Sequence, residues 1–173
     1  MTAKSSPADV LVSVVMGSDS DLPVMTEATK ILEEFDIGHE LILTSAHRSP
    51  ARTTKFAESA ASRGVKVIIV GAGAAAHLAG VIASQTTLPV IGVPIDATSL
   101  HGLDALLSTV QMPGGIPVAT MAIGKAGAKN AALFAVRLLA LENKKINTAL
   151  LAYIEKMARD VEKKQESISC RKS

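Results

Sequence analysis

The feature that most constrains the fold is an alternation of short, nearly continuous apolar runs with helical patterns. We predict buried strands at residues 10–16, 40–44, 65–70 and 89–93, and a weaker strand at 117–123. Apolar runs rich in Val and Ile are typical of parallel strands that are covered on both faces. Lys66 is the one charge in the third run, and it lies near the strand start, where solvent is close.

Amphipathic segments separate these strands. The apolar residues of the first predicted helix, 23–35, share one face: Val24, Ala28, Ile31, Leu32 and Phe35. Further helices are predicted at 51–63 and 77–85. This order indicates βαβ units, and hence an α/β domain built as an open three-layer αβα sandwich with a parallel sheet. Ligands bind beyond the carboxyl ends of the strands in such folds, so a site is expected in the turns after the first three strands.

Two later segments differ from these helices. Residues 130–141 are apolar nearly all round, with Arg137 as the only charge, and we favour an oligomer contact over an intrachain core helix. Residues 145–164 predict an amphipathic docking helix on which Glu155 and Arg159 pair at i, i+4. No repeat or linker interrupts the chain. We therefore predict a polar tail at 1–9, a single domain at 10–164 and a second tail at 165–173.

Composition and charge exclude several classes of function. The net charge is only +2 and the basic residues are dispersed, so neither a nucleic-acid nor a membrane partner is expected. With no Trp, one Tyr and three Phe, the chain lacks base-stacking platforms. The single cysteine, Cys170, has no intrachain partner, and no Cys/His cluster predicts a metal. Residues 10–16 are too short to span a bilayer and the N-terminus lacks a secretory pattern, which favours a cytoplasmic protein.

The turn after the first strand is a candidate phosphate cradle. Gly17 allows a tight turn, and Pro23 suits a helix start. The N–H groups at that helix start favour an anion, and Ser18 and Ser20 add hydroxyl donors. Capping of the helix by Ser20 or Asp21 is an equal alternative. Two carboxylates beside a phosphate are unfavourable, so one of the two aspartates of this turn is expected to face elsewhere, for example toward ribose hydroxyls.

The turn after the second strand, Ser45-Ala46-His47-Arg48-Ser49-Pro50, is more informative. Arg48 can bind a phosphate in a bidentate manner and Ser45 can donate to it. His47 lies between them, and a histidine can move a proton in either direction near neutral pH. The alternative is a surface His and Arg with Ser49 capping the next helix. Convergence of three polar groups at the expected ligand position favours function.

The turn after the third strand runs from Gly71 to His77 and nominally fits the dinucleotide fingerprint G-x-G-x-x-A, with Asp96 about twenty residues further on. The match is weak because it follows the third strand rather than the first. His77 heads the next helix, where a structural hydrogen bond and a ligand contact are both open. We also predict that the turn at 111–117 shapes a pocket wall.

Taken together, these turns resemble the bacterial N5-carboxyaminoimidazole ribonucleotide mutases of purine biosynthesis. The matching segments cover most of residues 10–141 in order: MGSDSD (16–21), SAHRSP (45–50), GAGAAAHLAG (71–80), LPVIGVP (88–94) and VQMPGGIPVATMAIGKAGAKNAAL (110–133). The resemblance implies a flavodoxin-like fold, a homo-octamer and an isomerase that needs no metal, biotin or ATP and hence no cofactor.

The resemblance also implies residue roles. His47 would be the proton-transfer residue. The ribose phosphate would be bound by Ser18, Ser20, Asp21, Ser45 and Arg48. Gly73, Ala74 and His77 would line the pocket around the aminoimidazole and its carboxylate.

Three positions depart from the family pattern. Ala74 stands where Gly is usual, Ala79 where Pro is usual, and Leu22 replaces a frequent Trp. At residue 74 a Cβ can crowd the ligand or oppose a positive φ.

The implied reaction moves a carboxylate from N5 to ring carbon C4 by decarboxylation and recarboxylation, with CO2 held beside its acceptor. Two alternatives remain at this point. One is a related carboxylase that adds free CO2 to the same aminoimidazole ribonucleotide. The other is a non-catalytic nucleotide or flavin carrier on the same fold, against which the scarcity of aromatic residues argues.

Overall fold

The computed structural model describes residues 10–169, so the predicted tail at 1–9 lies outside the described residues. Five strands and six α-helices follow in the order β1 (Val12–Met16), α1 (Leu22–Glu34), β2 (His39–Leu43), α2 (Pro50–Ala60), β3 (Val67–Gly73), α3 (Leu78–Ala83), β4 (Val90–Ile95), α4 (Leu103–Val110), β5 (Ala119–Thr120), α5 (Lys125–Ala140) and α6 (Lys144–Ser169). Short 3-10 turns, η2 (Asp19–Asp21) and η3 (Ala61–Arg63), precede α1 and follow α2.

The strands form one parallel sheet in the order β2-β1-β3-β4-β5. Val15 is paired with Ile42 on one side and with Val70 on the other, so β1 lies inside the sheet. This is the flavodoxin-like order, and the direction of chain progression reverses between β1 and β3. The carboxyl ends of these two strands therefore mark the expected ligand position.

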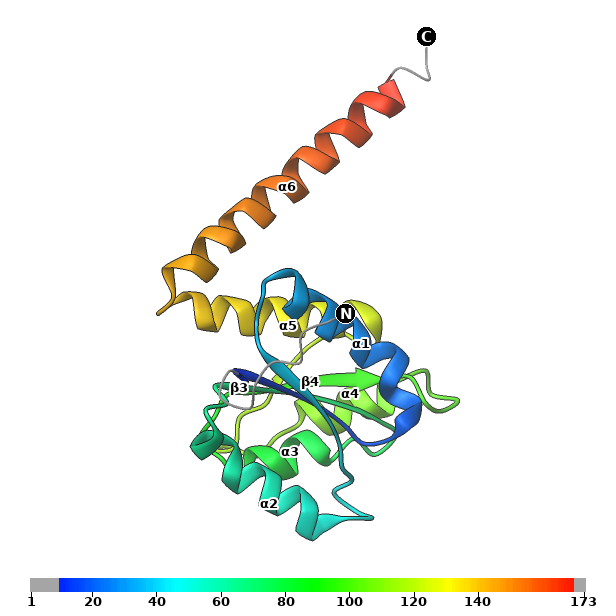
Figure 1. The fold of residues 1–173 in the computed structure, drawn as a ribbon. Coiled ribbons are helices and arrows are strands. Elements are labelled where there is room, and N and C mark those ends of the chain that lie inside the picture. The colour runs from blue at the N-terminus through cyan, green and yellow to red at the C-terminus, as the bar shows by residue number, and fades with distance from the viewer. Residues whose placement is uncertain (1–9, 170–173) are drawn as a thin grey trace. The chain divides into compact units, whose positions relative to one another are not determined.

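Helices cover both faces of the sheet and confirm the three-layer prediction. Figure 1 shows α2 and α3 on one face and α1 on the other. The buried cluster on the α2–α3 face joins Phe56 and Ile82 to Val15, Ile68 and neighbouring strand residues. On the α1 face, Met25 and Leu32 are fully buried. The sheet is thus apolar on both faces, as continuous Val and Ile runs require.

Several elements differ from the prediction. The strand predicted as buried at 40–44 is the edge strand β2, which is only partly buried, with Leu41 and Leu43 exposed. β3 continues through Gly73 because Ala72 and Gly73 pair with Pro94 and Ile95 of β4, so the G-x-G sequence is strand rather than turn. β5 contains only two residues, Ala119 and Thr120, whereas residues 117–123 were predicted. The helix α4 was not predicted at all.

The helix α5 also differs from expectation. It begins at Lys125, five residues before the predicted start, after Gly124 in a left-handed conformation (φ 76°). One side is lined by buried small residues, including Ala128, Ala131 and Ala132, whereas Phe134 is 37% exposed. One chain therefore does not bury this helix on all sides, and its role as an oligomer contact stays a prediction.

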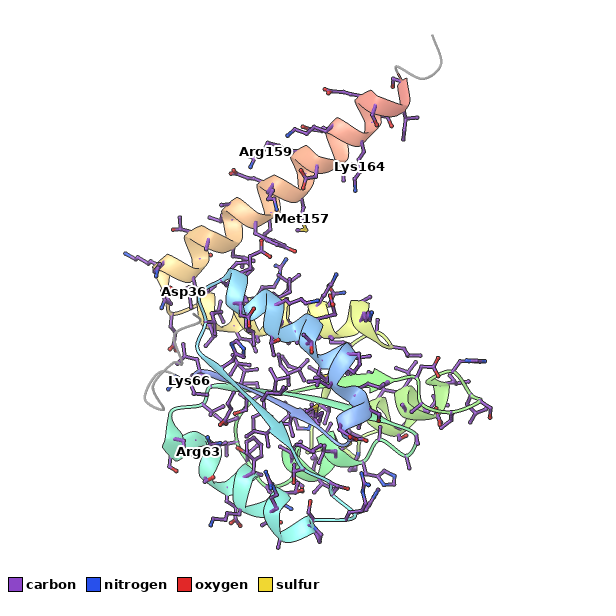
Figure 2. The ribbon with its side chains drawn as sticks, turned by 45° about the vertical axis from the view of Figure 1, so that its right-hand side comes forward. Asp36, Arg63, Lys66, Met157, Arg159 and Lys164 are labelled. Carbon is purple, nitrogen blue, oxygen red and sulfur yellow. The ribbon has the colours of Figure 1, made fainter. Side chains whose placement is uncertain are left out.

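Contacts divide the chain into two compact units, one ending at Ala135 and the other beginning at Val136, so the predicted single domain stays a prediction. In the second unit α6 continues to Ser169, beyond the predicted end at residue 164, because no Gly or Pro stops it. The predicted pair of Glu155 and Arg159 is present at 3.6 Å. Figure 2 shows Met157, Arg159 and Lys164 projecting from this helix. Among residues 10–169, no helix is long and apolar enough to cross a membrane.

Candidate functional site

A cavity of about 320 Å³ lies at the carboxyl ends of β1, β2 and β3. Its volume is in the usual range for a small-molecule site. It is lined by the turns that follow these strands and by Ala97 after β4, and it includes every predicted site residue: Ser18, Ser20, Asp21, Ser45, His47, Arg48, Gly73, Ala74 and His77. The structure therefore brings the three predicted turns together at the position where the strand order reverses.

The β1–α1 turn is held by a capping box. The Ser20 N–H and hydroxyl both donate to the Ser18 hydroxyl oxygen, at 3.4 and 2.9 Å. The Ser18 hydroxyl in turn donates to Asp19 Oδ1 at 3.1 Å. Ser18 thus caps the 3-10 turn η2, while Asp21, at the N-cap position of α1, makes no side-chain capping bond to that helix. The hydroxyls of Ser18 and Ser20 lie side by side at the cavity, with Asp19 as a competing acceptor.

Asp21 is buried beneath this turn and turned toward the backbone. The Ser18 N–H donates to Asp21 Oδ2 at 3.0 Å, which closes the turn. Burial raises the pKa of the Asp21 carboxyl, and the backbone N–H groups of Ser18 and Gly17 only partly offset it. Asp19 adds a smaller upward contribution by charge repulsion. The observed role of Asp21 is thus to brace the turn, and any contact with substrate stays a prediction.

The β2–α2 turn is closed by side chains of its own. The Ser45 N–H donates to the Ser49 hydroxyl at 3.0 Å, and that hydroxyl donates back to the Ser45 carbonyl at 3.1 Å. Ser49 therefore closes the turn and makes no side-chain cap on α2, contrary to the capping alternative. Arg48 reaches across to the first turn, where its Nη2 donates to the Gly17 carbonyl at 3.2 Å. The guanidinium is thereby fixed between the two turns that carry the serine hydroxyls.

His47 meets His77 from the neighbouring turn. The His47 Nε2 and His77 Nδ1 atoms lie 3.0 Å apart, and the rings are almost perpendicular, at 88°. His77 is the N-cap residue of α3, yet its side chain makes no capping bond to that helix. Both side chains are exposed to solvent. The site therefore holds two imidazoles that share one hydrogen bond at the mouth of the cavity.

The β3–α3 turn brings backbone close to the cavity floor. Gly73 ends β3, and a Cβ at this position would lie 2.5 Å from the Ala97 Cβ. Ala74 follows with φ 53°, in the left-handed region that disfavours residues with a Cβ. The Ser108 hydroxyl lies 3.4 Å from the Ala74 carbonyl and links this turn to α4. The expected positive φ is therefore present, with alanine rather than glycine adopting it.

Two aspects of the site were not foreseen. Ala97 lines the cavity after β4, and the strand-end rule, applied to the fourth strand as well, would have found it. The expected pocket wall at 111–117 is absent from this cavity in the part of the chain that the structure describes. Ala79, the second departure from the family pattern, is buried in α3 outside the cavity, and Leu22 is exposed at the start of α1.

The arrangement places groups that can bind an anion beside groups that can transfer protons. A guanidinium and serine hydroxyls can bind a phosphate, and the imidazole pair can give and take protons. Within residues 10–169, no group of three or more His, Cys, Asp or Glu side chains is placed to hold a metal ion.

Comparisons with known proteins connect this geometry to a family. The family model described as AIR carboxylase matches residues 11–160. The N5-carboxyaminoimidazole ribonucleotide mutase of Pyrococcus horikoshii is 56% identical over 158 residues, which cover 91% of this chain and 88% of that protein. The mutase of the same name from Thermotoga maritima is 52% identical over 157 residues, covering 91% of each chain.

A solved structure agrees with the sequence matches. The crystal structure of Treponema denticola PurE superposes with a TM-score of 0.82 at 27% identity, covering 91% of this chain and 97% of that one. Sequence and fold comparisons therefore point to the same group of proteins.

Proposed function

Because this chain belongs to the AIR carboxylase family, we propose that its cavity converts N5-carboxyaminoimidazole ribonucleotide into 4-carboxy-5-aminoimidazole ribonucleotide, a step of purine biosynthesis. The chain is an isomerase of the mutase type, as are its named relatives at more than half identity. The observation that supports the site assignment is the convergence of His47, Arg48 and the serine hydroxyls on one cavity.

Substrate binding is assigned to the two turns joined by Arg48. The guanidinium and the hydroxyls of Ser18, Ser20 and Ser45 bind the ribose phosphate, and Asp21 completes this side of the site. The Ser18 hydroxyl rotates away from Asp19 when it donates to the phosphate, because both acceptors compete for the same proton. Gly73, Ala74 and His77 line the opposite wall, around the aminoimidazole and its carboxylate.

His47 carries the proton transfers. The N5–carboxylate bond breaks with its electron pair returning to N5, which takes a proton from the His47 imidazolium and releases CO2 inside the cavity. Ring carbon C4 then attacks the trapped CO2, and the proton of C4 passes to the neutral imidazole. His47 ends protonated as it began, so no external acid or base is consumed. Confinement of CO2 beside C4 supplies the proximity that the second bond needs.

The assembled form is proposed to be a homo-octamer. Support comes from large apolar side chains that one chain leaves exposed on several elements, namely Leu41, Leu43, Leu107, Phe134, Leu151 and Val161. Sedimentation equilibrium tests this directly, and a species of eight chains is expected. A monomer at micromolar concentration would reject the assembly. The cytoplasmic location stays a prediction.

Two measurements test the reaction and the role of His47. Turnover of the N5-carboxylated substrate is compared with turnover of aminoimidazole ribonucleotide plus bicarbonate, and the first is expected to dominate. The reverse preference would identify a carboxylase that uses free CO2. His47→Asn is expected to retain substrate binding in calorimetry but to lose turnover by about 10²–10⁴-fold, the usual contribution of a general acid–base group. Near-normal turnover in that variant would remove His47 from the mechanism.

A further inference from the structure

The contact between the two imidazoles restricts how His47 can work. A hydrogen bond between Nε2 of His47 and Nδ1 of His77, 3.0 Å apart, needs one protonated and one bare nitrogen. We call the two bonded nitrogens, Nε2 of His47 and Nδ1 of His77, the inner nitrogens. The other nitrogen of each ring, Nδ1 of His47 and Nε2 of His77, is its outer nitrogen. Whichever ring donates decides whether the outer nitrogen of His47 can act as a base.

Only one of the two tautomer arrangements suits proton transfer. If His77 donates, neutral His47 accepts at Nε2 and carries its proton on Nδ1, so it has no basic outer nitrogen. If His47 donates from Nε2–H, its Nδ1 is bare when the ring is neutral and protonated when the ring is charged. Nδ1 can then give a proton to N5 and take one back from C4 while the inner bond stays intact.

We propose that His77 is a positioning residue, which accepts a hydrogen bond at Nδ1 and thereby fixes the ring orientation and the Nε2–H tautomer of His47. The inference rests on the proposed function, because it assigns the proton transfers to His47 Nδ1. It follows from the placement of His77, whose side chain makes no capping bond to α3 and is directed at His47 instead. His77 therefore acts through His47 as well as lining the cavity.

Two replacements of His77 distinguish hydrogen-bond acceptance from the filling of space by the side chain. An asparagine at this position would place an amide oxygen near the site of Nδ1 and could still accept from His47, whereas a leucine of similar size could not. His77→Leu is expected to lower kcat at least tenfold with KM changed less than about threefold, and His77→Asn to stay within about threefold of wild-type kcat. His101→Asn is the matched control, because His101 is a highly exposed histidine outside the cavity with φ 50°, a conformation that Asn tolerates.

A double-mutant cycle shows whether His77 works through His47. In the His47→Asn background, His77→Leu is expected to cause no further loss of turnover, because the ring that it positions is gone. Any of four results would overturn the proposal. Two are a wild-type kcat in His77→Leu and an equal loss of kcat in His77→Asn and His77→Leu. The other two are a change in KM without a change in kcat and additive losses of turnover in the cycle.

A spectroscopic readout tests the pair without any assay of turnover. The chain has only four histidines, so ¹⁵N magic-angle-spinning NMR of histidine-labelled protein can be assigned by single substitutions. At pH 8 we expect a protonated Nε2 on His47, a bare Nδ1 on His77 and a scalar coupling between them that His77→Leu abolishes. A bare Nε2 on His47, or no coupling, overturns the inference. Absence of turnover in the wild type with the coupling present would instead reject the proposed function.

Discussion

The left-handed Ala74 gives a stability prediction with a defined size. An L-residue at φ 53° brings its Cβ against the backbone, at a cost of about 1–2 kcal/mol that glycine avoids. Glycine also makes the unfolded chain more flexible, which lowers stability by about 0.4–1 kcal/mol. Ala74→Gly is therefore expected to raise the free energy of unfolding by roughly 0.5–1 kcal/mol, whereas a glycine substitution at an ordinary position lowers it.

The adjacent Ala75 provides the matched control. It lines the same cavity but has no positive φ, so Ala75→Gly changes only the entropy of the unfolded chain. The free energy of unfolding of this control is expected to fall by about 0.4–1 kcal/mol. The free energies of unfolding of the two variants should therefore differ by about 1–2 kcal/mol. Urea unfolding followed by far-UV circular dichroism, at one chain concentration for all three proteins, measures the difference. Equal losses in Ala74→Gly and Ala75→Gly would refute the assignment of strain to residue 74.

Three further predictions follow from contacts at and near the site. Gly73→Ala forces a Cβ against Ala97 and should cost about 1–3 kcal/mol in urea unfolding, and adding Ala97→Gly should restore most of the loss. The raised pKa of Asp21 means that the folded state binds this proton more tightly than the unfolded chain, so wild-type stability falls as pH rises from the ordinary Asp range through the raised pKa. Asp21→Asn removes this dependence and should therefore gain stability relative to wild type between about pH 4 and pH 7, and a flat difference would contradict the burial argument. Lys30 and Lys129 lower the pKa of Glu27, so Glu27→Gln should be less stable than wild type at pH 7, with the difference vanishing as pH falls through that lowered pKa.

Most of the fold could be predicted from the sequence because the three inner strands β1, β3 and β4 contain nearly continuous apolar runs. Val12–Met16 and Val90–Ile95 are buried throughout, and such segments carry their own signal. The helix α4 was missed although Leu103, Leu106, Leu107 and Val110 follow the i, i+3, i+4, i+7 spacing of an amphipathic helix. Its apolar residues Leu103, Leu107 and Val110 are exposed, and it starts after Gly102 in a left-handed conformation rather than at a side-chain cap. The missing cap removes the usual signal for a helix start, so only the apolar spacing marked this short helix in the sequence.

The site was predictable by position but not by contact. Strand ends of a parallel sheet meet at one edge, so the convergence of Ser18, His47 and Gly73 follows from topology, and all three line one cavity. The hydrogen bond between His47 and His77 depends instead on the conformations of two turns that lie thirty residues apart in the sequence. The length of β3 was likewise decided by pairing with β4, which overrides the turn preference of glycine.

The hydrogen bond from Arg48 to the Gly17 carbonyl has a consequence for how this enzyme can diverge. The acceptor belongs to the main chain, so every amino acid at residue 17 would offer the same oxygen. Substitution of residue 17 therefore leaves the acceptor of the Arg48 guanidinium in place. Insertion or deletion of a single residue in this turn would move the carbonyl oxygen away from Arg48. Descendants of this chain are therefore expected to vary at residue 17 but to keep the length of the turn.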